Sequence, residues 1–364
     1  ADEPTRVDSF GTWFRLASPS PFGTWTYGGD WWGDYANSWN NLNPAAPQGE
    51  FGDDATAGTF GLFVQNELPI GEQLELITAL RYSYAELEAR RVEGYGSLNG
   101  HWDALTASAR LAWRIRPDTL LHIGLAQGFR APNLADCTRL GEYASGSFES
   151  PTGQLGEERY LTYEIGAKSQ GAWGQILLTA YHTVSHDQIA RLTLGGDAIK
   201  RNLDRGYVQG VELKAQANLA GGFLLFGSIG WQQGKEDTYR NDEILLGETE
   251  QYISRLAPLG GDLGLRWTSP AKRFWTEARL RWAKRQDHLS FGDQNDTQRI
   301  PPGGTPGYGV ADLRGGWRID EHTDLALALE NLADKDYRIH GSGINEPGRN
   351  LVLHHQAAIE PAGG

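Results

Sequence analysis

The residue types that usually carry catalysis are present in this sequence, but they are not arranged for it. No nucleophile elbow, phosphate-binding loop or metalloprotease motif occurs. The adjacent His354 and His355 would point to opposite faces of a strand, which is a poor geometry for chelation. Asp53 and Asp54 lack the spacing of a dedicated calcium loop. The single cysteine, Cys137, excludes an intramolecular disulfide and a cysteine zinc cluster. We therefore expect no catalytic residue, no metal site and no resident cofactor.

Chemistry suited to binding is easier to find, in a segment rich in aromatic residues. Trp25, Trp31 and Trp32 stand among Gly, Ser, Asn and Pro between Gly11 and Ala55, a segment that we predict to be one long external loop. Exposed aromatic faces in a polar loop suit recognition of a catecholate, a porphyrin or a sugar. Self-packing of the loop, with anchoring at a membrane interface, is the alternative interpretation.

Charged residues form a second recurrent set, at every other position of several segments. If these segments are strands, the charges share one face and can form cross-strand ladders. We predict that they line a wet interior, where ladder formation is a simpler role than direct contact with a ligand. The residues are Arg110, Arg266, Glu277, Arg279, Arg281, Asp312 and Arg314.

Alternation of apolar and polar residues identifies the elements that position these groups. From Leu105 to Ile115 the apolar residues fall on odd numbers and most polar residues on even numbers, a period of two that a helix would scramble. Similar segments recur to the end of the chain and predict about 13 antiparallel strands. Mean hydropathy is −0.49, and no run approaches the roughly 20 apolar residues of a membrane helix. The fold class is therefore all-β.

The connections separate a soluble sandwich from a membrane barrel, which share this alternation. Short and long connections take turns along the chain, as the tight periplasmic turns and extended external loops of outer-membrane barrels do. The short ones are 69–73, 116–118, 170–173, 219–222, 269–272 and 320–323, and the long ones are 11–55, 90–102, 131–157, 233–254, 286–306 and 339–349. The 13 Trp residues suit interfacial girdles. The net charge of −13 argues against a nucleic-acid partner.

Several phrases, in order, resemble the TonB-dependent receptors of bacterial outer membranes. They include "FGLFVQNELPIGEQLELITALRYS" (60–83), "GFRAPNLAD" (128–136), "YLTYEIGAKS" (160–169), "RGYVQGVELKAQ" (205–216), "TPGYGVADLRGGWR" (305–318) and "LALENLADKDYRIHGSG" (327–343). Each phrase is weak alone, and their order and spacing carry the resemblance. The chain is similar to the C-terminal part of the barrel over residues 1–364, an incomplete barrel of about 13–14 strands out of about 22 in the family. No plug domain is expected in it.

The resemblance implies function as well as fold. It implies an outer-membrane active transporter and not an enzyme, importing a scarce nutrient such as an iron–siderophore complex and energised by TonB through a plug outside this chain. The implied partners are a small-molecule ligand, such as a metal chelate, and outer-membrane lipid. Arg130 and Asn133 join the three tryptophans as candidate ligand contacts. Haem is disfavoured because no histidine lies between Leu134 and Glu157. A passive porin, and a soluble β-rich carbohydrate-binding or hydrolytic protein, remain as alternatives.

Overall fold

The alternating segments form long antiparallel strands in the computed structural model, which describes residues 4–42, 48–142 and 148–357. The strands are β1 (Thr5–Ser20), β2 (Gly23–Ser38), β3 (Asp53–Ile70), β4 (Leu74–Val92), β5 (Gly96–Arg116), β6 (Thr119–Arg130), β7 (Gly141–Glu142), β8 (Phe148–Glu149), β9 (Glu158–Gly171), β10 (Gly174–Leu194), β11 (Asp197–Asn218), β12 (Phe223–Tyr239), β13 (Glu248–Tyr252), β14 (Gly260–Thr268), β15 (Phe274–Ala283), β16 (Tyr308–Arg318), β17 (Thr323–Glu330) and β18 (Asn350–Ala357). Helical turns occur only in connections of the described chain: α1 (Leu134–Thr138), α2 (Phe291–Asn295), η1 (Ala220–Gly222), η2 (Arg240–Asp242) and η3 (Ile244–Leu246).

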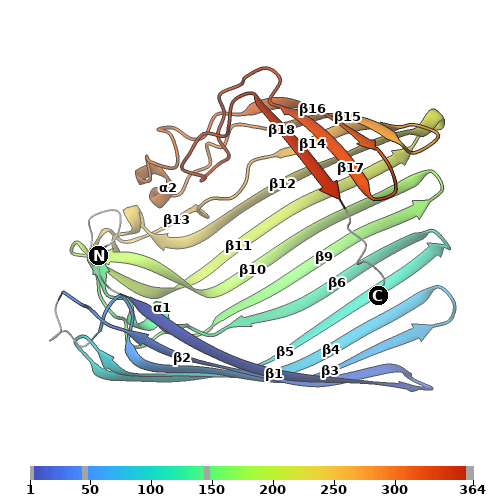
Figure 1. Ribbon diagram of the computed structural model, residues 1–364. Coiled ribbons are helices and arrows are strands. Elements are labelled where there is room, and N and C mark those ends of the chain that lie inside the picture. Colours follow the sequence, from blue (N-terminus) through green and yellow to red (C-terminus); the bar gives the residue numbers. More distant parts are fainter. Residues whose placement is uncertain (1–3, 43–47, 143–147, 358–364) are drawn as a thin grey trace, which may run out of the picture.

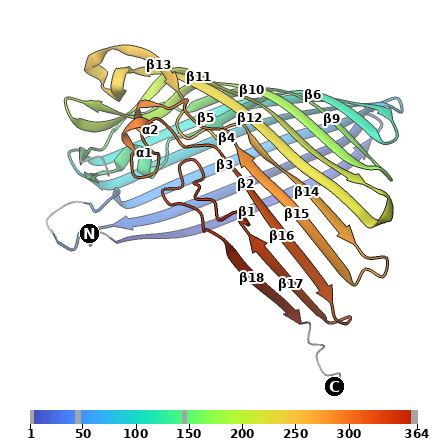
Figure 2. The same ribbon diagram turned by 90° about the horizontal axis from the view of Figure 1, so that it is seen from above.

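The long strands form one up-and-down meander. Each pairs antiparallel with the next, from β1 to β18, while the short β7, β8 and β13 lie in connections. Of the 18 strands, removing these three leaves 15 long ones, slightly more than expected. No pairing joins β1 to β18 within the described residues, so the curved sheet is open at these two edges (Figures 1 and 2). The fold is an incomplete barrel.

The apolar rows lie on a face of the sheet that the described chain leaves uncovered. Leu105, Ile123 and Leu263 keep 63%, 58% and 53% of their surface exposed. A soluble sandwich would bury these rows between two sheets. On β5 the row from Leu105 to Ile115 spans ten residue steps, about 34 Å along the strand and about 26 Å across a membrane at a tilt of about 40°. This matches the apolar band of an outer-membrane barrel, about 25 Å tall.

The two rims of the sheet differ, as the connections predicted. All six short connections are tight turns at one rim, and a seventh, at Pro21–Phe22, joins β1 to β2. Connection 131–157 and the last three predicted loops, observed at 240–259, 284–307 and 331–349, lie at the opposite rim, where Figure 1 places α1, α2 and β13. The prediction of a loop at 90–102 is wrong, because β4 and β5 continue past the apolar band and meet in a turn at 93–95. None of the described helices is long and apolar enough to cross a membrane.

The predicted loop from Gly11 to Ala55 is also wrong: most of it is strand. It contains the second part of β1 and all of β2, and the true loop between β2 and β3 begins only after Ser38. The sequence obscured these strands because glycines stand opposite aromatic residues. Gly11 is paired with Trp32 across the hairpin, and a Cβ at Gly11 would lie 2.0 Å from the indole ring. The ring therefore covers the glycine, and the strand lacks an ordinary apolar row.

A small packed core lies at the rim of the long loops. Ala36, Ala55 and Leu87 project from the polar face of the sheet and are buried against Cys137 and Leu155 of the connection 131–157. This connection therefore folds back onto the polar face. The polar face is the interior of the barrel, and the apolar face is its outer surface.

Candidate ligand-binding site

The three tryptophans do not form one recognition surface. They are residues of β2, where successive side chains point to opposite faces. Trp25 and Trp31 lie on the apolar outer face, where the ring of Trp31 is 5.9 Å from that of Phe10. Trp32 lies on the interior face above Gly11. A single ligand cannot stack on all three residues, and the two outer ones are placed to contact lipid.

Arg130 and Asn133 belong to a folded connection. Arg130, at the end of β6, donates to Glu158 from Nε at 2.6 Å and from Nη2 at 2.5 Å, and to Asp136 from Nη1 at 2.7 Å. Asn133 caps α1, since its Oδ1 accepts from the backbone N–H of Asp136 at 2.8 Å. Lys200 adds a 3.2 Å ion pair to Asp136. These groups hold connection 131–157 against β9 and β11.

The titration behaviour of this connection fits a structural role. Burial by itself raises the pKa of Asp136 and Glu158, but hydrogen bonds from Arg130 and other donors, together with the nearby positive charges, outweigh burial, and the net pKa of both carboxyls is lowered. Burial also raises the pKa of the Cys137 thiol to about 12. A thiol in this environment is a poor nucleophile and a poor metal ligand.

The predicted charged set lies on the interior face, and six of its seven members form cross-strand ion pairs. The pairs are Arg266–Glu277 at 3.8 Å, Arg279–Asp262 at 3.1 Å, Arg281–Asp312 at 2.8 Å and Arg314–Glu330 at 3.0 Å. Asp312 is 1% exposed and also accepts from the backbone N–H of Asn331 at 3.0 Å. The Arg266 guanidinium also lies 4.0 Å from the ring centre of Trp275. Arg110 is exposed on the same face. These ion pairs connect neighbouring strands of the wall.

A cavity of about 550 Å³ opens beside these cross-strand ion pairs. It lies on the interior face, at the end near the long connections. Its floor includes Glu212, Arg279 and Arg281, and residues of three long connections, among them Lys284 and Arg338, complete it. The volume is in the range of small-molecule sites, about 300–1,000 Å³. No local pattern in the sequence indicated this cavity, because its lining is drawn from positions between 181 and 340.

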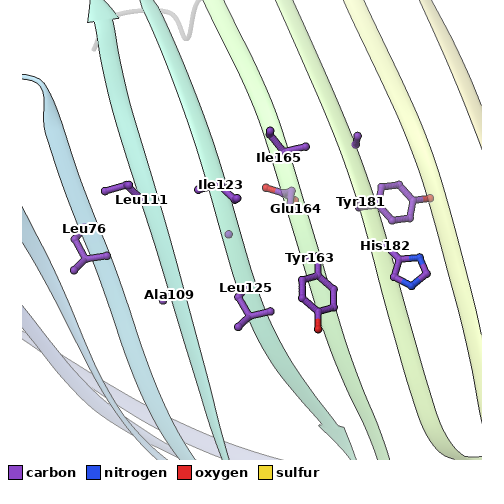
Figure 3. A pocket seen from close by; sticks show the side chains of 12 residues that line it. Leu76, Ala109, Leu111, Ile123, Leu125, Tyr163, Glu164, Ile165, Tyr181 and His182 are labelled. Carbon is purple, nitrogen blue, oxygen red and sulfur yellow. The ribbon is translucent and has the colours of Figure 1, made fainter.

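A groove of about 610 Å³ lies instead on the outer face (Figure 3). The groove is bordered by Leu111, Ile123 and Ile165. It is hollow because some residues between these larger side chains, such as Ala109, are small. The rings of Tyr163 and His182 lie at one end of it, 6.4 Å apart. The groove is part of the surface that meets acyl chains.

The meander, its uncovered apolar face and its charged interior define an integral β-barrel of the outer membrane. The family model described as "TonB dependent receptor-like, beta-barrel" matches residues 2–332, and the chain belongs to this family. Proteins of this family are outer-membrane transporters of Gram-negative bacteria and not enzymes. The chain is accordingly an outer-membrane protein.

Solved structures with the same fold include a copper transporter, a ferric enterobactin receptor and a hemophore receptor. The copper transporter OprC superposes with a TM-score of 0.79 at 17% identity, over 98% of this chain and 57% of that one. The ferric enterobactin receptor PfeA of Pseudomonas aeruginosa gives 0.70 at 17% identity, over 97% and 54%. The hemophore receptor HasR of Serratia marcescens gives 0.72 at 17% identity, over 97% and 60%. The chain thus spans a little over half the length of these relatives.

Proposed function

We propose that this chain supplies the wall and the external ligand-binding loops of an active transporter for a scarce nutrient, such as an iron–siderophore complex, energised through TonB. One observation carries the proposal: long connections fold back onto the charged interior face and enclose a cavity beside it. A passive pore would need an open interior, whereas folded loops around a cavity suit capture of a ligand.

The nutrient class is inferred from relatives and from the donor groups of this chain. The three solved relatives are a copper transporter, a ferric enterobactin receptor and a hemophore receptor in complex with its hemophore and haem. This sequence has no methionine, and its cysteine is buried with a raised pKa. No cluster of His, Cys, Asp and Glu in the described part of the chain is arranged to hold a metal ion. These features favour a metal carried inside an organic chelate over a bare ion.

Energy coupling belongs to the same proposal. In the mechanism that the family resemblance implies, a ligand binds the external loops, a plug rearranges, and TonB transmits force to it. The described residues are barrel wall and connections. We therefore assign the TonB contact to a plug in another part of the full-length protein.

Uptake in the native bacterium tests this proposal. Deleting the gene should abolish uptake of a radiolabelled iron–siderophore complex under iron limitation, and deleting TonB should have the same effect. Restoring the gene should restore uptake only where TonB is present. Uptake that persists without TonB, together with steady conductance of the full-length protein in planar bilayers, would instead establish a passive porin.

A further inference from the structure

The cavity beside the cross-strand ion pairs has a net positive lining, although the protein as a whole is negatively charged. Its lining contains the cations Arg255, Arg279, Arg281, Lys284 and Arg338 against the anions Glu212 and Asp262, five against two. The chain as a whole carries a net charge of −13. The cavity is thus a local reversal of the protein's charge.

Hydrogen bonding neutralises only part of this positive charge. Arg281 is matched by Asp312, and Arg255 is matched by Asp296 at 2.7 Å. In contrast, the partners of Arg338 among the described residues are neutral oxygens, those of Asn345, Gln298 and Arg299.

Two more cations retain free donors. Lys284 is exposed, and its ammonium has no partner among the described residues. Arg279 bonds Asp262 through Nε at 3.1 Å, and no contact occupies its two terminal nitrogens in the described chain. Donors on Lys284, Arg279 and Arg338 are therefore available to an anion.

The walls of the cavity are held in place before any ligand arrives. Thr305 forms a strand-like bridge with Gln286, and its hydroxyl is 2.8 Å from Nδ1 of His340. The Gln286 amide donates to the Leu256 carbonyl at 2.6 Å. The backbone N–H of Arg255 donates to the buried Asp293 at 3.1 Å. The walls around the donors thus need little reordering when a ligand binds, which lowers the entropy lost on binding.

We propose that this cavity binds a small polyanion, in particular a metal chelate with net negative charge, through Lys284, Arg338 and Arg279. The proposal rests on the proposed function and narrows its cargo to anionic chelates. Charge-assisted hydrogen bonds to an anion are stronger than neutral ones, and a cleft lined by one sign of charge concentrates ligands of the opposite sign. A neutral chelate of the same size gains neither advantage.

Three iron chelates of different charge test the proposal on purified full-length protein in detergent. Ferric tris-catecholate and ferric dicitrate are anionic, and a neutral ferric tris-hydroxamate is the comparison. Quenching of tryptophan fluorescence measures affinity at low and high salt. We expect at least one anionic chelate to bind tenfold or more tightly than the neutral one, with the advantage shrinking in high salt. Equal affinity for all three, or no binding of either anion, would overturn the proposal.

Paired variants locate the site. Lys284→Gln and Arg338→Gln should each weaken anion binding about tenfold or more. Lys272→Gln and Arg116→Gln remove the same charges at the opposite rim and should leave affinity unchanged. Equal effects of the two sets would refute the location, and the salt dependence of the unaltered protein keeps the test valid if a variant misfolds. TonB-dependent uptake of the neutral chelate alone would refute this inference and leave the proposed function standing.

Discussion

A positive charge placed on the outer face should destabilise the barrel far more than the same charge on the interior face. Ile123 lies in the middle of the outer row of β6, level with Leu111 of β5 and Ile165 of β9. Its side chain is 58% exposed, so in water Ile123→Arg would change stability by about 0.5 kcal/mol or less. At the midplane of a bilayer the same change costs about 2–4 kcal/mol.

The matched control is Ala126→Arg on the same strand. Ala126 is exposed on the interior face and is flanked by Ser108 and Thr162. An arginine there stays in water, and we expect a cost of about 0.5 kcal/mol or less. Urea unfolding of the full-length protein in phosphatidylcholine vesicles, followed by tryptophan fluorescence, measures both. If Ile123→Arg costs no more than Ala126→Arg, the apolar rows do not face hydrocarbon, and the membrane assignment fails.

Three further predictions concern the ladder, the connection 131–157 and an external carboxyl. Asp312→Ala leaves Arg281 without its partner and should cost about 2 kcal/mol in the same unfolding assay, a discounted value because the arginine is about a third exposed; the cost should fall when Arg281→Ala is added. Arg130→Ala should speed protease cleavage in the connection that contains α1 without changing the unfolding midpoint of the strands; unchanged cleavage would show that the network does not hold it. Glu236 lies beyond the outer end of the apolar row of β12, and burial raises its pKa to about 7, from 4.5. Since the folded pKa is above the unfolded one, its contribution to stability is complete below about pH 4.5 and is lost as the pH rises through about 7. Hydrogen exchange of residues 240–259, corrected for intrinsic rates, should be slower at pH 5 than at pH 8, and Glu236→Gln should remove the difference.

The site was less predictable than the fold. The alternation from Leu105 to Ile115 was enough to predict a strand, because a period of two is a local property. The role of Arg130 was not local, since its main partner, Glu158, follows 28 positions later at the start of another strand. Arg130 and Asn133 stay predictions as ligand contacts, and the hydrogen bonds they make in the structure hold connection 131–157 in place.

The β1–β2 hairpin shows why the alternation of apolar and polar residues can fail to predict a strand. Trp31 and Trp32 are neighbours in sequence and were interpreted as one aromatic surface, although adjacent strand residues face opposite sides. The useful signal was the recurrence of glycine between aromatic residues from Trp25 to Tyr35. A glycine covered by a ring from the next strand is a property of the pair, and a single strand does not display it.

The amino-acid sequence by itself determined most of the strands from β3 onward, most of the tight turns between them and the face on which their side chains lie, because these follow from neighbours a few positions apart. The tertiary structure decided which charges meet. Lys284 and Arg338 are distant in the chain and lie at one cavity only because the register of the strands and the folding of three connections bring them there. Tight turns and the apolar pattern can fix the register of neighbouring strands, but the folding of long connections over the interior face depends on contacts between segments far apart in the chain, which no local pattern specifies.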